Sequence, residues 1–256
     1  MKSINQYITE KLNIKKSQYN YFPKTKRELQ DLIKQLIKER GIKGNFNDID
    51  TSQITDMSYL FFDMALFNGD ISGWDVSNVE KMQQMFRGCN SFNQDISHWD
   101  VSNVENMYDM FFYCKSFNGD LSNWDVSSVK NMFGMFRKCF KFEGKGVDKW
   151  NISDKINVKS MFVGCRSFNA NLSKWDVSKI EEMNNMFAGC EKFDGIGLEK
   201  WNVESCKDMT EMFLRCRNFV GNLDNWKVSK NTIVKDMFKS CLKYFPPKWY
   251  HLYNKN

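Results

Sequence analysis

The chain has 256 residues, of which 42% are hydrophobic, so it holds enough apolar material for the packed core of one or two domains. No run approaches 18 consecutive apolar residues, which excludes a transmembrane helix and predicts a chain without membrane insertion. The net charge of +6 is unevenly spread: residues 1–44 balance to +7, residues 227–256 to +6 and the stretch between them to −7. Because phosphate binding favours one continuous basic stripe, this pattern argues against nucleic acid as the main partner.

The N-terminal segment predicts a helix that caps whatever follows. The segment Thr25–Arg40 is followed by Gly41 as a stop signal, and it places five apolar residues on one stripe: Leu29, Leu32, Ile33, Leu36 and Ile37. Because the end of a repeat stack exposes its core, we expect residues 1–44 to form a basic, helical N-terminal cap. The first twelve residues lack the apolar stretch of a secretory signal peptide. We therefore expect a location in a cytoplasm or inside a virus particle assembled there.

A repeat of about 25 residues dominates the rest of the chain. A tryptophan column, a cysteine column and a column of Met-Phe pairs recur in the same order with gaps of 25 or 26 residues. The tryptophans are Trp74, Trp99, Trp124, Trp150, Trp175, Trp201 and Trp226, and the cysteines are Cys89, Cys114, Cys139, Cys165, Cys190, Cys216 and Cys241. The two longer repeats take their extra residue in one glycine-containing loop, where glycine tolerates unusual backbone angles. We expect about eight repeats over residues 45–243, closed by an aromatic segment at 244–256.

Within each repeat the pattern predicts a short strand followed by a short helix. In residues 121–126 the tryptophan and valine alternate with Asp125, as in a strand with two inward side chains. Residues 102–105 have the S-x-x-E spacing of a capping box, and residues 104–114 carry their apolar side chains on one helical face. The expected fold is an α/β repeat solenoid with one short parallel strand and one helix of roughly ten residues in each turn.

Residues 107–129 read MYDMFFYCKSFNGDLSNWDVSSV, and this motif resembles the repeat of BspA-like leucine-rich repeat surface proteins, including the mycoplasma lipoprotein repeats. The resemblance extends over residues 49–245. It implies a leucine-rich-repeat-like solenoid that serves adhesion or protein recognition. Surface members need a signal peptide or lipobox, which this sequence lacks, and the chain is in this respect more similar to relatives encoded by phages and large viruses.

The residue types argue against catalysis and against a metal site. The two histidines, His98 and His251, lie at opposite ends of the array, and no catalytic or nucleotide-binding motif is present. Zinc sites need ligands two to four residues apart, whereas the cysteine column has one member per repeat. We therefore expect no enzyme activity, no cofactor, no metal and no small-molecule substrate, and we interpret the column as buried free thiols. Cys206 lies off the column, which leaves open whether its thiol is exposed.

One polar column follows the tryptophans and is the candidate binding site. It consists of Asp75, Asp100, Asp125, Asn151, Asp176 and Asn202. Two interpretations stay open: the side chains accept hydrogen bonds from nearby turn amides and from Ser or Asn neighbours, or they form a row that contacts a basic or amide-rich protein partner of unknown identity. On the second interpretation the chain is a non-catalytic protein–protein interaction scaffold that binds through the exposed strand face.

Three other functions compete with this hypothesis. The first is a cell-surface adhesin, exported without a leader or as a fragment of a larger protein. The second is a component of a phage or virus particle. The third is weak nucleic-acid binding through the basic ends, with Lys11, Lys15, Lys16, Lys24, Lys26 and Arg27 as the contacting cations.

Overall fold

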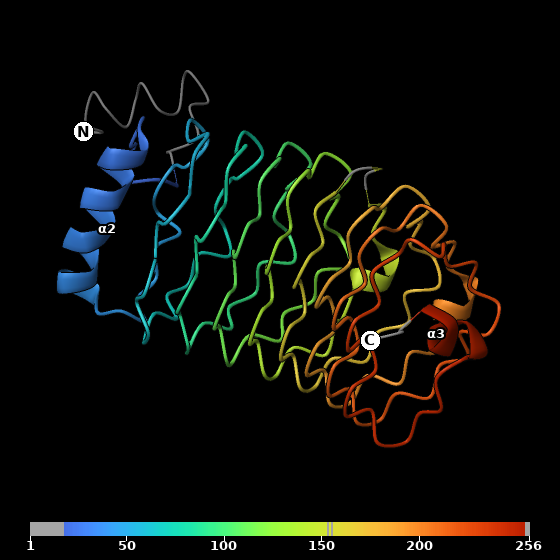
Figure 1. Cartoon of the computed structure of the whole chain (residues 1–256). Helices are drawn as coiled ribbons and strands as arrows, with labels where there is room; N and C mark the ends of the chain where they lie inside the picture. The colour runs from blue at the N-terminus through green and yellow to red at the C-terminus, as the bar shows by residue number, and fades with distance from the viewer. Residues whose placement is uncertain (1–17, 153, 155, 254–256) are drawn as a thin grey trace, which may run out of the picture.

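The computed structural model describes residues 18–152, 154 and 156–253. Figure 1 shows successive turns of the chain side by side, between one helix at the N-terminal end and a shorter one at the C-terminal end. The helical elements are α2 (Lys26–Arg40), the 3-10 helices η1 (Val147–Lys149) and η2 (Leu198–Lys200), and α3 (Lys248–Tyr253). Over the described ranges, no helix combines the length and the apolar character needed to cross a membrane.

The predicted strand and helix of each repeat are both wrong. In the described part of the chain the repeats form no extended strand, and parallel pairing between turns comes down to isolated bridges such as Asn106 with Asn131. The segment expected to be a strand folds into tight turns, in which the Trp124 amide donates to the Leu121 carbonyl at 3.2 Å. The molecule is therefore a stack of turn-rich repeats and not the expected α/β solenoid.

Residues 107–114 show why the expected helix does not form. The amide of Asp109 donates to the Phe133 carbonyl of the next turn at 2.8 Å, whereas the Phe112 amide donates back to the Asp109 carbonyl at 3.1 Å. Amides along the segment thus alternate between the next turn and their own turn. An α-helix would use them all internally. The alternation needs left-handed backbone, and φ is +48° at Asp109 and +68° at Tyr113.

The left-handed residues recur in every turn as two columns, four residues apart. The first column is 59, 84, 109, 134, 160, 185, 211 and 236, and the second is 63, 88, 113, 138, 164, 189, 215 and 240. Glycine fills only Gly134 in the first column and Gly88, Gly164 and Gly189 in the second. A non-glycine residue pays roughly 1–2 kcal/mol for this conformation. The backbone hydrogen bonds between turns, each contributing about 1 kcal/mol, offset that strain.

The core consists of side-chain columns that stack along the repeat axis. The rings of Phe136 and Phe162 lie 5.7 Å apart with planes 1° apart, and the same stacking recurs from turn to turn. The indole of Trp124 donates to the Ile96 carbonyl at 3.0 Å, and the thiol of Cys139 donates to the Phe111 carbonyl at 2.9 Å. Each buried polar group in these columns therefore has a partner in the neighbouring turn, which explains their strict period.

The two glycine insertions form the same local structure. Each lengthened loop contains a 3-10 helix, η1 or η2, and each helix follows a left-handed glycine. The φ angle is +91° at Gly146 and +99° at Gly197. A Cβ on Gly146 would lie 2.2 Å from the Ser122 amide of the preceding turn, so the close approach of the two turns requires glycine here.

The N-terminal helix is present where the sequence predicts it. The Thr25 side chain accepts the Glu28 amide at the start of α2, and Gly41 ends the helix with φ +79°. Leu29, Ile33 and Leu36 are fully buried and belong to the same core as the stacked turns. The helix thus covers the apolar end of the stack.

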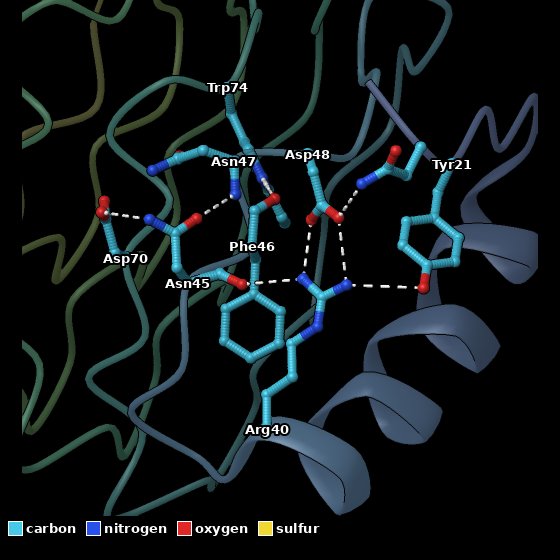
Figure 2. A network of polar contacts seen from close by, with 9 residues as sticks. Tyr21, Arg40, Asn45, Phe46, Asn47, Asp48, Asp70 and Trp74 are labelled. Atoms are coloured by element: carbon cyan, nitrogen blue, oxygen red, sulfur yellow. Dashed lines mark hydrogen bonds and ion pairs between the residues drawn. The ribbon is translucent and has the colours of Figure 1, made fainter. Parts of the chain in front are cut away.

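A polar network holds the C-terminal end of α2 against the first turn (Figure 2). The Arg40 guanidinium donates to both carboxylate oxygens of Asp48, at 2.7 and 3.0 Å, and to the Asn45 carbonyl at 2.9 Å. Arg40 also lies 5.5 Å from the centre of the Tyr21 ring. The hydrogen bond from Arg40 holds the pKa of Asp48 below its ordinary value. The pair therefore stays ionised and bidentate, a geometry that fixes orientation.

Candidate functional site

The polar column predicted to bind a partner lies in the turns that replace the expected strand. We call Asp75, Asp100, Asp125, Asn151, Asp176 and Asn202 the carboxylate row, and all six side chains are exposed. In the four aspartates, Oδ1 accepts the amide of the serine two residues later at 3.0 to 3.1 Å. Asn202 accepts the Glu204 amide in the same way at 3.1 Å. The position two residues after Asn151 lies outside the described residues.

This geometry gives each aspartate one structural oxygen and one outward oxygen. Oδ1 closes the local turn, and Oδ2 accepts no hydrogen bond from any of the described residues. The hydrogen bonds from Ser127 and Ser178 lower the pKa values of Asp125 and Asp176. Asp125 and Asp176 are therefore ionised near neutral pH, and each is held in the same orientation within its own turn. Both interpretations of the column have a structural basis. Oδ1 accepts the hydrogen bond that caps the turn, and Oδ2 remains available for a partner.

The serine of the predicted capping box plays a different part. The Ser102 hydroxyl donates to Asp100 Oδ1 at 2.6 Å, and the Glu105 amide donates to the Glu80 carbonyl of the preceding turn. The Glu105 carboxylate reaches Lys130 of the next turn at 2.7 Å. The S-x-x-E spacing therefore does not mark the start of a helix. The serine caps its own turn, and the glutamate links that turn to the turns before and after it.

The eight cysteines are all free and all buried. In the column, each Sγ donates to a phenylalanine carbonyl of the preceding turn, as Cys114 does to Phe86 at 2.9 Å. Cys206, which the sequence left open, is only 2% exposed, and burial raises its pKa to about 12. These thiols are protonated and shielded, so they act as small core side chains rather than as nucleophiles.

The basic residues offered as nucleic-acid contacts are only partly available. Lys26 contacts Asp56 at 3.3 Å and also Ser58, and Arg27 lies 4.0 Å from Asp31. Lys24 is exposed. Lys11, Lys15 and Lys16 lie outside the described residues. Two of the three described cations therefore already face carboxylates.

Sequence reasoning missed a surface column in which arginine and phenylalanine alternate. The guanidinium of Arg87 lies 5.1 Å from the ring centres of both Phe62 and Phe112, and that of Arg137 lies 4.2 Å from Phe112. Beside them the Asp109 carboxylate is 1% exposed, and burial raises its pKa while Arg137 and Arg87 oppose the shift. In the sequence the only sign of this column is that positions 62, 87, 112 and 137 read Phe, Arg, Phe and Arg. The alternation becomes visible only when several repeats are aligned.

The same column changes character farther along the stack and opens a groove of about 590 Å³. The positions equivalent to Arg137 hold Val163, Ala188 and Leu214, which form an apolar floor. We call the site the basic groove. Its charged lining residues are Lys138, Arg166, Glu191, Arg215 and Arg217.

These features define a repeat protein built from stacked turns. One set of side-chain columns is buried and packs the turns together, and another set is polar and exposed. A family described as "Mycoplasma protein of unknown function, DUF285" matches residues 29–146 and, again, residues 132–247. The chain belongs to this family, which confirms the mycoplasma-type repeat indicated by the sequence. No curated protein and no solved structure matches the chain.

Proposed function

We propose that the chain is a non-catalytic protein-binding scaffold whose partner contacts the carboxylate row. The observation that carries this proposal is the fixed orientation of Asp75, Asp100, Asp125 and Asp176, each with an outward oxygen that the fold does not use. Preorganised charges lose little side-chain entropy when a partner binds. A row of like charges also steers a basic partner and speeds its approach at low salt. The partner is therefore a protein with a basic surface.

The test is the triple variant Asp100→Asn, Asp125→Asn and Asp176→Asn. Asparagine keeps the Oδ1 acceptor, as Asn202 demonstrates with the Glu204 amide, so each turn keeps its cap while the charge is lost. The control is Asp70→Asn, Asp95→Asn and Asp120→Asn, because these aspartates cap serine turns five residues before the row positions 75, 100 and 125. Both triples remove three charges from equivalent turns. We expect only the first to weaken binding.

A partner recovered by pull-down from the native host serves as the ligand, and thermal unfolding is measured on the same samples. We expect the first triple to reduce affinity at least tenfold at low salt while its melting temperature stays near that of the natural chain. Equal affinity for both triples would remove the recognition role. A large fall in melting temperature for the first triple alone would assign these aspartates to folding.

We further place the scaffold inside a cell or a virus particle, with a cell-surface adhesin as the alternative. Eight unpaired cysteines support the internal location, since exported proteins favour disulfides. Protease treatment of intact host cells separates the two, because only a surface adhesin is cleaved from outside. Cleavage of the chain on intact cells would overturn the internal location and leave the scaffold proposal standing.

A further inference from the structure

The basic groove exists because two successive turns lack a side chain at one surface column. Along the second left-handed column the residues are Tyr113, Lys138, Gly164, Gly189 and Arg215. A Cβ on Gly164 would meet nothing closer than 3.6 Å, and one on Gly189 nothing closer than 3.5 Å, so a Cβ at either position would make ordinary van der Waals contact without a clash. Lys138 and Arg215 thus stand at the two ends of a trough that is two turns long and floored by Val163, Ala188 and Leu214.

The charge of the groove is one-sided. Four cations and one acid line it, and the acid, Glu191, lies 3.6 Å from Arg166. Among the residues that the structure describes, no carboxylate forms an ion pair with Lys138, Arg215 or Arg217. Three cations around an apolar floor therefore suit a ligand that carries negative charge and an aliphatic part.

The dimensions of the groove favour an extended chain. Successive turns stack at 5.7 Å in this part of the molecule, and three such steps separate Lys138 from Arg215. An extended peptide rises about 3.3 Å per residue, so about five residues reach from one end cation to the other. A central aliphatic side chain then lies over the floor, and acidic side chains near the peptide's ends reach the cations.

The aromatic residues at the rim argue for peptide over single-stranded nucleic acid. Base stacking needs a free ring face. Lys115 and Lys138 lie 4.7 and 5.1 Å from the centre of the Tyr113 ring, and Arg166 lies 4.8 Å from that of Phe140. Each of these rings thus already has a cation against it, and the floor between the basic ends is aliphatic.

We propose that the basic groove binds an extended acidic peptide segment of a partner protein, with an aliphatic residue over the floor and carboxylates at Lys138 and Arg215. The inference rests on the proposed protein-binding function and adds a second surface with the opposite charge preference. It stands on residues outside the carboxylate row, so the two proposals fail separately.

The test measures fluorescence anisotropy of a fluorescein-labelled pentapeptide, a leucine flanked on each side by two glutamates. The comparison peptide replaces every glutamate by glutamine. The groove variant is Lys138→Glu with Arg215→Glu, which keeps a Cβ at both left-handed positions. The matched control is Lys149→Glu with Lys174→Glu, two exposed lysines outside the groove that reverse the same number of charges.

We expect the acidic peptide to bind the natural chain at least tenfold more tightly than the glutamine peptide. The groove variant should lose at least tenfold in affinity and the control less than twofold. Equal loss in both variants would show that the peptide senses net charge alone, which overturns the proposal. Tighter binding of a labelled oligothymidylate, lost in the groove variant, would overturn it in favour of nucleic acid. A failed peptide test leaves the carboxylate-row test on the host partner unaffected.

Discussion

The indole of Trp249 donates a hydrogen bond to the Leu223 carbonyl at 2.9 Å. Its ring lies 6.4 Å from that of Trp226 with planes 14° apart, the spacing found between Trp201 and Trp226 in the repeat. Trp249 is therefore an eighth member of the tryptophan column, supplied by α3 rather than by a repeat. The closing segment thus adds one more ring to the tryptophan column at the end of the stack. Beside it, Tyr250 packs against Phe238 with ring centres 5.0 Å apart.

Replacement of Trp249 by alanine should destabilise the C-terminal end of the stack. The ring is only half-buried, so the loss should be about 2 kcal/mol, below the range for a fully buried tryptophan. Urea unfolding measures the change. The control is Phe245→Ala, because Phe245 is 93% exposed and should contribute almost nothing. Equal losses in the two variants would contradict a role for Trp249 in the ladder.

The buried thiols should make the protein less stable in alkali. Burial raises the pKa of Cys206 to about 12 and that of Cys241 to about 11. It also raises the pKa of Cys114 well above its ordinary value. Unfolded cysteines ionise near pH 8.5, so above that pH unfolding releases protons and the free energy of unfolding falls as pH rises.

Urea unfolding between pH 8 and 10 checks this slope, and Cys114→Ala should make it shallower by up to about 1.4 kcal/mol per pH unit at its upper end. A thiol reagent should react slowly with the native chain and count eight thiols after denaturation without reductant. A count of four or fewer would contradict the free-thiol core.

The Arg40–Asp48 pair predicts an acid-sensitive N-terminal end. The pKa of Asp48 is lowered in the folded state, so its contribution is present above the ordinary pKa and is lost as pH falls through the folded one. Asp48→Asn should cost about 1–2 kcal/mol at pH 7, and the difference from the natural chain should shrink towards pH 2. Asp31→Asn, which removes an exposed partner of Lys34, should change stability by less than about 0.5 kcal/mol. A pH-independent difference for Asp48→Asn would rule out the electrostatic cause.

The repeat period and the buried columns could be predicted from the sequence because stacking aligns identical residues. Trp124 and Cys139 recur at one interval since each bonds to the turn before it. The helix α2 was predictable as well, because Thr25, its apolar stripe and Gly41 are local signals.

The conformation inside each turn could not be predicted from residue types. Apolar spacing in residues 104–114 fits a helix, but the left-handed angles at Asp109 and Tyr113 depend on hydrogen bonds to the next turn, which no local pattern reveals. The carboxylate row was found as a column, whereas its serine caps were misread as helix caps. The basic groove went unnoticed, although Gly164 and Gly189 in successive repeats, flanked by Lys138 and Arg215 in the same column, were the available signal.

The central claim, that a partner contacts the carboxylate row, is tested most directly by hydrogen–deuterium exchange of the chain with and without the partner recovered from the host. The amides of Ser77, Ser102, Ser127 and Ser178 lie beneath the row and donate to its aspartates. We predict slower exchange in residues 74–78, 99–103, 124–128 and 175–179 when the partner is bound. A bound partner that slows exchange elsewhere, and leaves these four segments unchanged, would contradict the claim.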